Sequence, residues 1–139
     1  MEDPHLLQRF LDAQDPVFDT VRAELERGRK ASHWMWFVFP QIAGLGHSAM
    51  ARRYAIASLA EAQAYLAHPV LGPRLRTCAG LVNAVQGRSI GEILGHPDDL
   101  KFQSCMTLFR LAAPDDDVFR HALDKYFGGQ EDAATLSRL

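Results

Sequence analysis

The sequence has few cysteines, little net charge and no long apolar run. Cys78 and Cys105 are the only cysteines among the 139 residues, and two are too few for a disulfide framework. The formal net charge is −2 at pH 7, so no strong surface field favours nucleic acid or an acidic membrane. No apolar stretch could span a bilayer, and the first residues lack a signal-peptide pattern. We therefore expect a cytoplasmic protein that binds neither nucleic acid nor membrane.

The usual motifs for metals, phosphates and cofactors are also missing. The chain has no glycine-rich loop with P-loop or dinucleotide spacing, no Cys-x-x-Cys and no histidine pair four residues apart. No serine stands in a nucleophile elbow. The sequence thus predicts no metal site and no cofactor.

What the chain does have is apolar content and helix signals. With 47% hydrophobic residues, it is expected to form one domain over residues 1–139 that buries about 70% of its unfolded surface. Cys78 and Cys105 fall on apolar helix faces, which favours buried free thiols in a reducing compartment. Ser48 is a candidate N-cap, and Ser58-x-x-Glu61 and Ser89-x-x-Glu92 match the capping box. We predict an all-α fold: a single compact multi-helix domain with a short buried aromatic segment.

That aromatic segment is the stretch from Ser32 to Gln41, which contains both tryptophans. Periodicity does not distinguish a helix from a strand here, because residues 34–39 are all apolar. A lone strand would leave its backbone groups unpaired. The predicted structure is therefore a short buried helix, with Ser32 as its cap and Pro40 at its end.

The polar tips of this segment suggest the wall of a pocket. His33, Trp34, Trp36 and Gln41 would supply an imidazole, two indole N–H groups and an amide beside apolar contact area. The alternative interpretation is that the rings serve mainly to pack the core and that His33 is a satisfied, partly buried histidine.

A helix predicted to begin near residue 97 and end near residue 112 supplies the candidate for a second wall. Lys101, Ser104 and Thr107 are polar residues within or beside its apolar face, where they are costly unless something pairs with them. The alternatives are that the Lys101 head reaches water while its stem covers apolar surface, and that Ser104 bonds to the preceding turn. If both walls exist, we expect them to face each other across one hollow.

Several motifs together resemble one bacterial family, the domain-of-unknown-function family 1810. They are residues 32–41, Gly44-Leu45-Gly46-x-Ser48, Tyr65-Leu66-x-His68-Pro69-x-Leu71-Gly72-x-Arg74-Leu75, Asp99-x-Lys101-x-x-Ser104-x-Met106-Thr107-Leu108-Phe109 and Asp132-x-x-Thr135-Leu136. The resemblance implies a small, mainly helical, stand-alone cytoplasmic protein and no particular activity. A weaker similarity, in size, helical content and aromatics beside polar residues, is to NADAR-type domains, which process ADP-ribose-like nucleotides and N-glycosides.

Two hypotheses of function follow. In the first, the pocket binds a small phosphorylated or ribosylated metabolite, with indole against a ring and Lys101, Arg29 and Lys30 near phosphate. Hydrolysis of an N-glycosidic bond is then possible, with Asp99 as the nominated carboxylate and Lys101 beside it. In the second, the protein is a non-catalytic interaction module or homodimer whose aromatic segment is partly exposed. A monomer that binds a small molecule is the favoured prediction.

Overall fold

The regular secondary structure of this computed structural model, which describes residues 2–139, is entirely helical. Its helices are α1 (Gln8–Gln14), α2 (Phe18–Glu26), α3 (Met35–Val38), α4 (Ala49–Arg53), α5 (Leu59–Ala67), α6 (Leu71–Ala84), α7 (Ile90–Leu94), α8 (Asp98–Ala112), α9 (Asp117–Phe127) and α10 (Ala133–Leu136). Within this range the only strand-like pairing is an isolated parallel bridge between Ile42 and Ile56. The predicted all-α single domain is confirmed.

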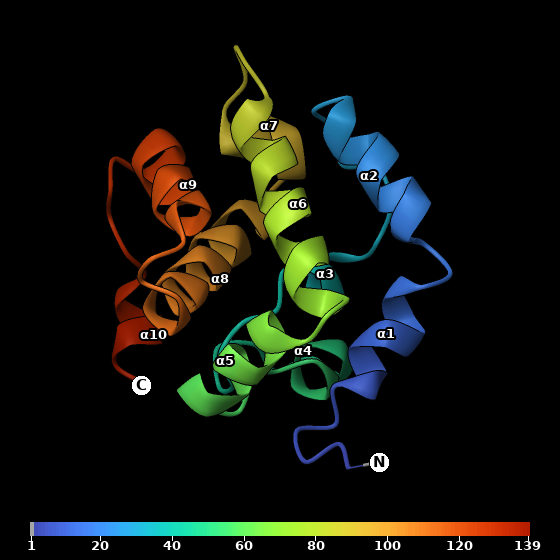
Figure 1. The fold of residues 1–139 in the computed structure, drawn as a ribbon. Helices are drawn as coiled ribbons and strands as arrows, with labels where there is room; N and C mark the ends of the chain where they lie inside the picture. Colours follow the sequence, from blue (N-terminus) through green and yellow to red (C-terminus); the bar gives the residue numbers. More distant parts are fainter. Residues whose placement is uncertain (1) are drawn as a thin grey trace.

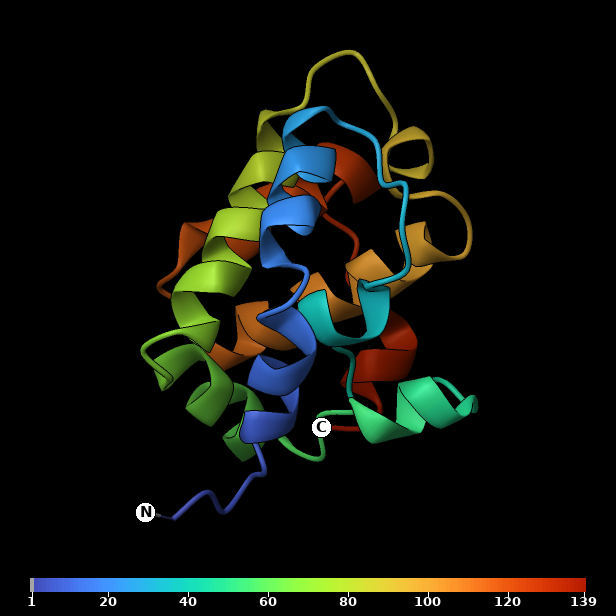
Figure 2. The ribbon, with the colours of Figure 1, turned by 90° about the vertical axis from the view of Figure 1, so that its right-hand side faces the viewer.

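Helix α8 lies at the centre of the arrangement. It contacts α5, α7, α9 and α10, while α6 packs against α2, α5 and α9 (Figure 1). The turned view shows α3 beside α1, with α8 behind them (Figure 2). Among residues 2–139, no helix combines the length and the apolarity needed to cross a membrane.

Two chains of aromatic rings connect these helices inside the core. In the first, ring centroids lie 5.1 Å apart for Phe10 and Tyr65 and 5.4 Å apart for Tyr65 and Phe109, which joins α1, α5 and α8. In the second, Phe39 lies 5.0 Å from Phe102, edge to face, which joins the segment after α3 to α8. Such contacts stabilise a core beyond their buried area, and they hold the aromatic segment firmly on α8. Cys78 and Cys105 are also buried, as free thiols, as predicted.

Most of the predicted helix caps form. Ser48 Oγ accepts a hydrogen bond from Ala51 N, and Ser89 with Glu92 makes a complete capping box. The predicted box at Ser58 is only half right. Ser58 Oγ accepts from the Glu61 amide at 3.1 Å, but the Glu61 carboxylate turns to Ala57 N and to Arg9 instead. An ion pair with a distant helix has therefore replaced a local contact.

Arg9 uses all its side-chain donors to fasten α1 to the chain between α4 and α5. Its Nε donates to Arg53 O at 2.9 Å, and its Nη2 donates to Ala55 O and to Glu61 Oε2, each at 2.9 Å. Nη1 donates to two carbonyls of the segment that precedes α1. A planar guanidinium has five N–H donors in fixed directions, so Arg9 fixes the end of α4 relative to α1.

The aromatic segment forms a shorter helix than the sequence suggests. Only Met35–Val38 is helical, and Trp34 rather than Ser32 precedes it, with no side-chain cap. The prediction of a Ser32 cap is wrong because its hydroxyl and amide both donate to Glu24, at 2.6 Å and 3.0 Å. The residues before α3 thus bind a buried carboxylate on α2 instead of starting a helix.

Candidate functional site

Glu24 on α2 anchors the start of the aromatic segment. Its buried carboxylate accepts the indole N–H of Trp34 at 2.9 Å, the Ala31 amide at 2.7 Å and both donors of Ser32. Burial alone would raise the pKa of Glu24, but the four hydrogen bonds together lower it to about 2. The charged carboxylate therefore orients Trp34 and sets the direction in which the chain enters α3.

Two lysines lie over the two tryptophans, one over each ring, and a single carboxylate contacts both lysines. Lys30 Nζ is 3.0 Å from Asp98 Oδ2 and 5.1 Å from the Trp34 ring centre. Lys101 Nζ is 3.7 Å from Asp98 Oδ1 and 5.7 Å from the Trp36 ring centre. These distances are within cation–π range. Asp98 therefore joins Lys30, in the link between α2 and α3, to the first turn of α8 and leaves Lys101 the more loosely held of the two lysines.

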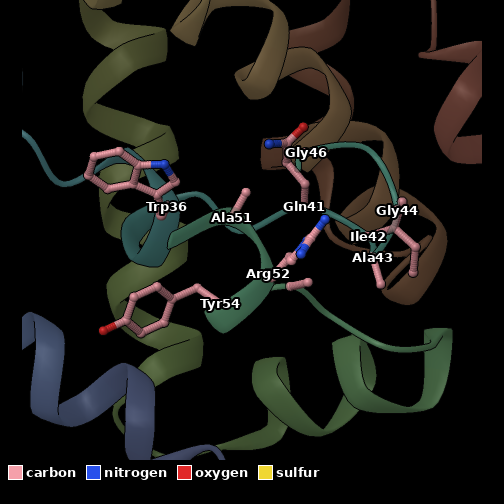
Figure 3. A pocket seen from close by; sticks show the side chains of 10 residues that line it. Trp36, Gln41, Ile42, Ala43, Gly44, Gly46, Ala51, Arg52 and Tyr54 are labelled. Atoms are coloured by element: carbon pink, nitrogen blue, oxygen red, sulfur yellow. The ribbon is translucent and has the colours of Figure 1, made fainter. Parts of the chain in front are cut away.

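A hollow of about 140 Å³ opens beside Trp36. Figure 3 shows the indole on one side, the loop that follows α3 on the other, and the side chains of Gln41 and Arg52 between them. Trp36 is only half-buried, unlike Trp34. One indole thus stands free to contact a ligand, whereas the other is fixed in the core. The full lining is Trp36, Gln41, Ile42, Ala43, Gly44, Gly46, Ala51, Arg52, Tyr54 and Ala55.

A second hollow, of about 230 Å³, lies where this loop meets α8 and α10. It is lined by Gln41, Leu45, Gly46, Pro97, Leu100, Lys101, Ser104, Asp132 and Ala134. Gln41 and Gly46 belong to both linings. The two hollows are therefore neighbours that share a wall, and together they form one candidate site that extends from Trp36 to Asp132.

The loop between the two hollows is held by backbone contacts. Ile56 N donates to Gln41 O, and Ala43 N donates to Ile56 O, each at 2.8 Å. Gly44 has a φ of +96°, which favours glycine, and the Arg138 guanidinium lies directly where its side chain would project. This loop is thus fixed at its base and closely covered at its tip.

Cations without a carboxylate partner border the loop. Arg52 and Arg138 form no ion pair with any residue in the range 2–139, whereas all four arginines of helices α1, α6 and α8 do. Lys101 adds a third positive charge, but it pairs with Asp98 at 3.7 Å. Arg52 lines the first hollow and has no carboxylate partner among residues 2–139, and such a charge favours an anionic ligand.

The structure brings together part of the residue set predicted from the sequence. Gln41, Lys101 and Ser104 line one hollow, and Trp36 lines its neighbour. Ser104 Oγ lies 2.9 Å from Asp132 Oδ2 and 3.2 Å from Leu100 O, so its one proton has two acceptors within reach, the carboxylate and the expected carbonyl of the preceding turn.

Other members of that set lie elsewhere. Thr107 is fully buried, where it donates to Gln103 O and accepts from Asp132 N, so it positions α10. Asp99 Oδ1 contacts His96 Nδ1 at 3.0 Å, outside both hollows. His33 and Arg29 are exposed and line neither hollow, while Trp34 and Lys30 lie behind the site in contact with Glu24 and Asp98.

Three residues of the site were missed by the sequence analysis: Arg52, Asp98 and Asp132. Asp98 lies three positions before Lys101, a spacing that places both on one helix face, and this signal was available. Asp132 belongs to a quoted motif, but only the fold brings it to Ser104. Arg52 follows the predicted cap Ser48 and looked like an ordinary exposed helix residue.

The remaining hollows carry less chemistry. One of them, of about 620 Å³, lies between the N-terminal segment and α5, beside Asp3 and His68. Those polar groups already cap helices, because Asp3 accepts from the Leu7 and Gln8 amides and His68 Nδ1 accepts from Val70 N and Leu71 N. Across residues 2–139, no three His, Cys, Asp or Glu side chains are grouped so that they could hold a metal ion.

Comparison with known proteins places the chain in a family. It is similar to a solved structure, the conserved hypothetical protein Rv1873 from Mycobacterium tuberculosis, with 59% sequence identity and a TM-score of 0.97 over 99% of this chain and 98% of that one. None of the curated proteins matches. The family model described as protein of unknown function (DUF1810) matches residues 4–139. The chain therefore belongs to the DUF1810 family.

Proposed function

We propose that the protein binds a small phosphorylated or ribosylated metabolite, such as ADP-ribose or a nucleotide, across the two hollows. The observation that supports this most is the shared wall of Gln41 and Gly46, which connects the half-buried Trp36 indole in one hollow to the Lys101 ammonium in the other. Ligand sites combine apolar contact area with a few convergent polar groups, and this is what the two hollows offer together.

Each side chain has a distinct part in this proposal. The Trp36 indole contacts the planar ring of the ligand, since aromatic faces stack on bases without strong preference. Gln41 offers both an amide donor and an acceptor at the shared wall. Arg52 and Lys101 meet the phosphate from opposite hollows, and Arg52 has a planar fork that suits two phosphate oxygens.

Binding alone is proposed, without bond cleavage. Hydrolysis of an N-glycosidic bond requires a carboxylate that stabilises the developing positive charge and activates water. Asp99, the carboxylate nominated from the sequence, pairs with His96 away from both hollows. Asp132 does line the second hollow, but one of its oxygens already has three donors around it.

The interaction-module alternative has less support. It required an aromatic segment that is partly exposed as a contact surface, yet Trp34, Met35, Phe37, Val38 and Phe39 are all buried. Trp36 is the partly exposed ring of this run, and it borders the first hollow.

Calorimetry and thermal unfolding with AMP, ADP-ribose, ribose 5-phosphate and inorganic phosphate test this proposal. A ligand present at a hundredfold excess over its dissociation constant should stabilise the fold by about 2.7 kcal/mol, a shift of several degrees. Arg52→Gln should weaken binding of a phosphate ester about fivefold, the loss of one partly exposed charged contact. Trp36→Phe should remove the ligand-dependent change in tryptophan fluorescence, because Trp34 is buried and held by Glu24.

The matched control is Arg53→Gln. Arg53 is adjacent, also exposed and likewise without an ion pair in the described part of the chain, but it does not line either hollow. Arg53→Gln should bind as the unchanged protein does. Absence of binding for every ligand in the panel, or equal effects of the two arginine substitutions, would contradict the proposal.

A further inference from the structure

Asp132 carries one carboxylate oxygen that the fold leaves unused. Its Oδ2 is surrounded by donors: Thr135 Oγ1 at 2.6 Å, Ser104 Oγ at 2.9 Å and Thr135 N at 3.1 Å. Its Oδ1 accepts no hydrogen bond from residues 2–139. This oxygen is also not fully buried, because the buried side-chain atoms without a partner do not include it. The residue itself lines the second hollow. A carboxylate with one oxygen fixed and the other accessible is preorganised to accept hydrogen bonds from a ligand.

The orientation of this carboxylate is set on several sides. Asp132 caps α10 through Thr135, and its own amide donates to Thr107 Oγ1 at 2.9 Å. These contacts tie α10 to the middle of α8. Little side-chain entropy therefore remains to be lost when a ligand binds, which favours affinity.

Lys101 and Ser104 are one helical turn apart on α8, and Ser104 holds Asp132. The Lys101 ammonium and the Asp132 carboxylate thus line the same hollow, and Lys101 pairs with Asp98 rather than with Asp132. A pentose phosphate carries a phosphate at one end and ring hydroxyls at the other, so it offers a group to each of these side chains. Free phosphate could use only the cationic side of this pair and would be repelled by the other.

From this pairing, and resting on the proposed function, we infer that Asp132 Oδ1 accepts hydrogen bonds from the vicinal hydroxyls of a ribose. The site would then bind ribosyl phosphates more tightly than deoxyribosyl phosphates or free phosphate. Lys101 binds the phosphate, and Asp132 binds the sugar hydroxyls. Asp132 is then the residue that determines specificity within the second hollow.

The test compares ribose 5-phosphate, 2-deoxyribose 5-phosphate and inorganic phosphate by calorimetry. The unchanged protein should bind ribose 5-phosphate about tenfold more tightly than the deoxy compound, as expected for a hydrogen bond to a charged group. Asp132→Asn should reduce that ratio to near one. The asparagine keeps an oxygen for Ser104 and Thr135 and presents a donor to the hollow, so α10 stays docked. Lys101→Gln should weaken both phosphate esters equally and leave their ratio unchanged.

Asp124→Asn, the loss of an exposed carboxylate on α9, is the matched control and should leave the ratio at about ten. Asp132→Asn could lower the unfolding temperature so strongly that its binding is not measurable. The ratio of the two sugar phosphate affinities in the unchanged protein then tests the inference, because equal affinities overturn it. Equal affinity with measurable binding overturns this inference alone. No binding of any phosphate ester overturns the proposed function and this inference with it.

Discussion

Glu24 accepts the indole N–H of Trp34 at 2.9 Å, although both side chains are buried and belong to different segments of the chain. The same carboxylate receives three further hydrogen bonds from Ala31 and Ser32. A buried charge is stable only where donors replace the water that it has lost. Glu24 therefore determines how the chain turns from α2 into the aromatic segment, and with it where Trp36 lies.

Acidification should destabilise the protein through Glu24. Its pKa is about 2 in the folded state, compared with an ordinary value of 4.5. A lowered folded pKa means that the stabilisation is complete above pH 4.5 and is lost as the pH falls from there toward 2. The contribution is on the order of 3 kcal/mol. The free energy of unfolding of Glu24→Gln, measured in urea between pH 2 and pH 7, should lack this part of the pH dependence.

Glu26→Gln is the control for that experiment. Glu26 is on the same helix and more than half exposed, with only a 3.8 Å contact to Arg22. Such surface pairs contribute little, so this variant should retain the pH dependence of the unchanged protein. If the two variants had the same pH profile, Glu24 would not be the group responsible.

Gln14 should prove essential to the packing of α1. Its buried Nε2 donates to Phe37 O at 2.7 Å and to the Tyr65 hydroxyl at 3.0 Å. Gln14→Leu leaves both acceptors without this donor, which costs about 2–4 kcal/mol for two such groups. Tyr65→Phe should cost about 1 kcal/mol. The double variant should be less destabilised than the sum of the two, by 0.5 kcal/mol or more, when the free energy of unfolding is measured in urea; strict additivity would argue against a direct contact.

Two glycines in α6 should respond in opposite directions to alanine. A methyl group on Gly72 would overlap the backbone oxygen of Leu66, whereas one on Gly80 would meet nothing within 4 Å. Gly72→Ala should destabilise the fold by about 1–3 kcal/mol through overpacking. Gly80→Ala should stabilise it by about 0.5–1 kcal/mol, because alanine is the better helix former. Thermal midpoints of the two variants, each compared with the unchanged protein, give the sign directly.

Both cysteines should be unreactive until the chain unfolds. Burial raises the pKa of Cys78 to about 12 and that of Cys105 well above its ordinary value, and neither thiol reaches the surface. Only the thiolate is nucleophilic, so a colorimetric disulfide reagent should label neither residue in buffer and both in concentrated urea. Fast labelling of one thiol in the native protein would show that α6 or α8 opens locally.

Helix content and ends were largely predictable because they depend on neighbouring residues. The caps at Ser48 and Ser89 and the glycine after α9 operate within one turn, which the sequence displays directly. Glu61 shows the limit of this reasoning. Its spacing from Ser58 fits a capping box, yet its carboxylate binds Arg9, 52 residues away.

The candidate site was harder to predict, because its polar groups come from distant segments. The sequence indicated that Lys101 and Ser104 interrupt an apolar face, but not that Asp132 would come to them from α10. Asp99 was nominated as the carboxylate beside Lys101, but Asp98 is the one that contacts Lys101. Adjacent helix positions point about 100° apart, so the two aspartates lie on different faces of α8. Glu24 and Gln14 gave no signal at all, since a buried polar residue on a short helix looks the same in sequence as an exposed one.

The hydrogen bonds of Arg9 connect α1 to one edge of the hollow beside Trp36. By binding the carbonyls of Arg53 and Ala55, Arg9 fixes the end of α4, and Arg52 and Ala55 line the hollow beside Trp36. A substitution at position 9 should therefore displace Arg52 and Ala55 through the main chain. The shape of the hollow beside Trp36 would then change while every residue that lines it stays the same.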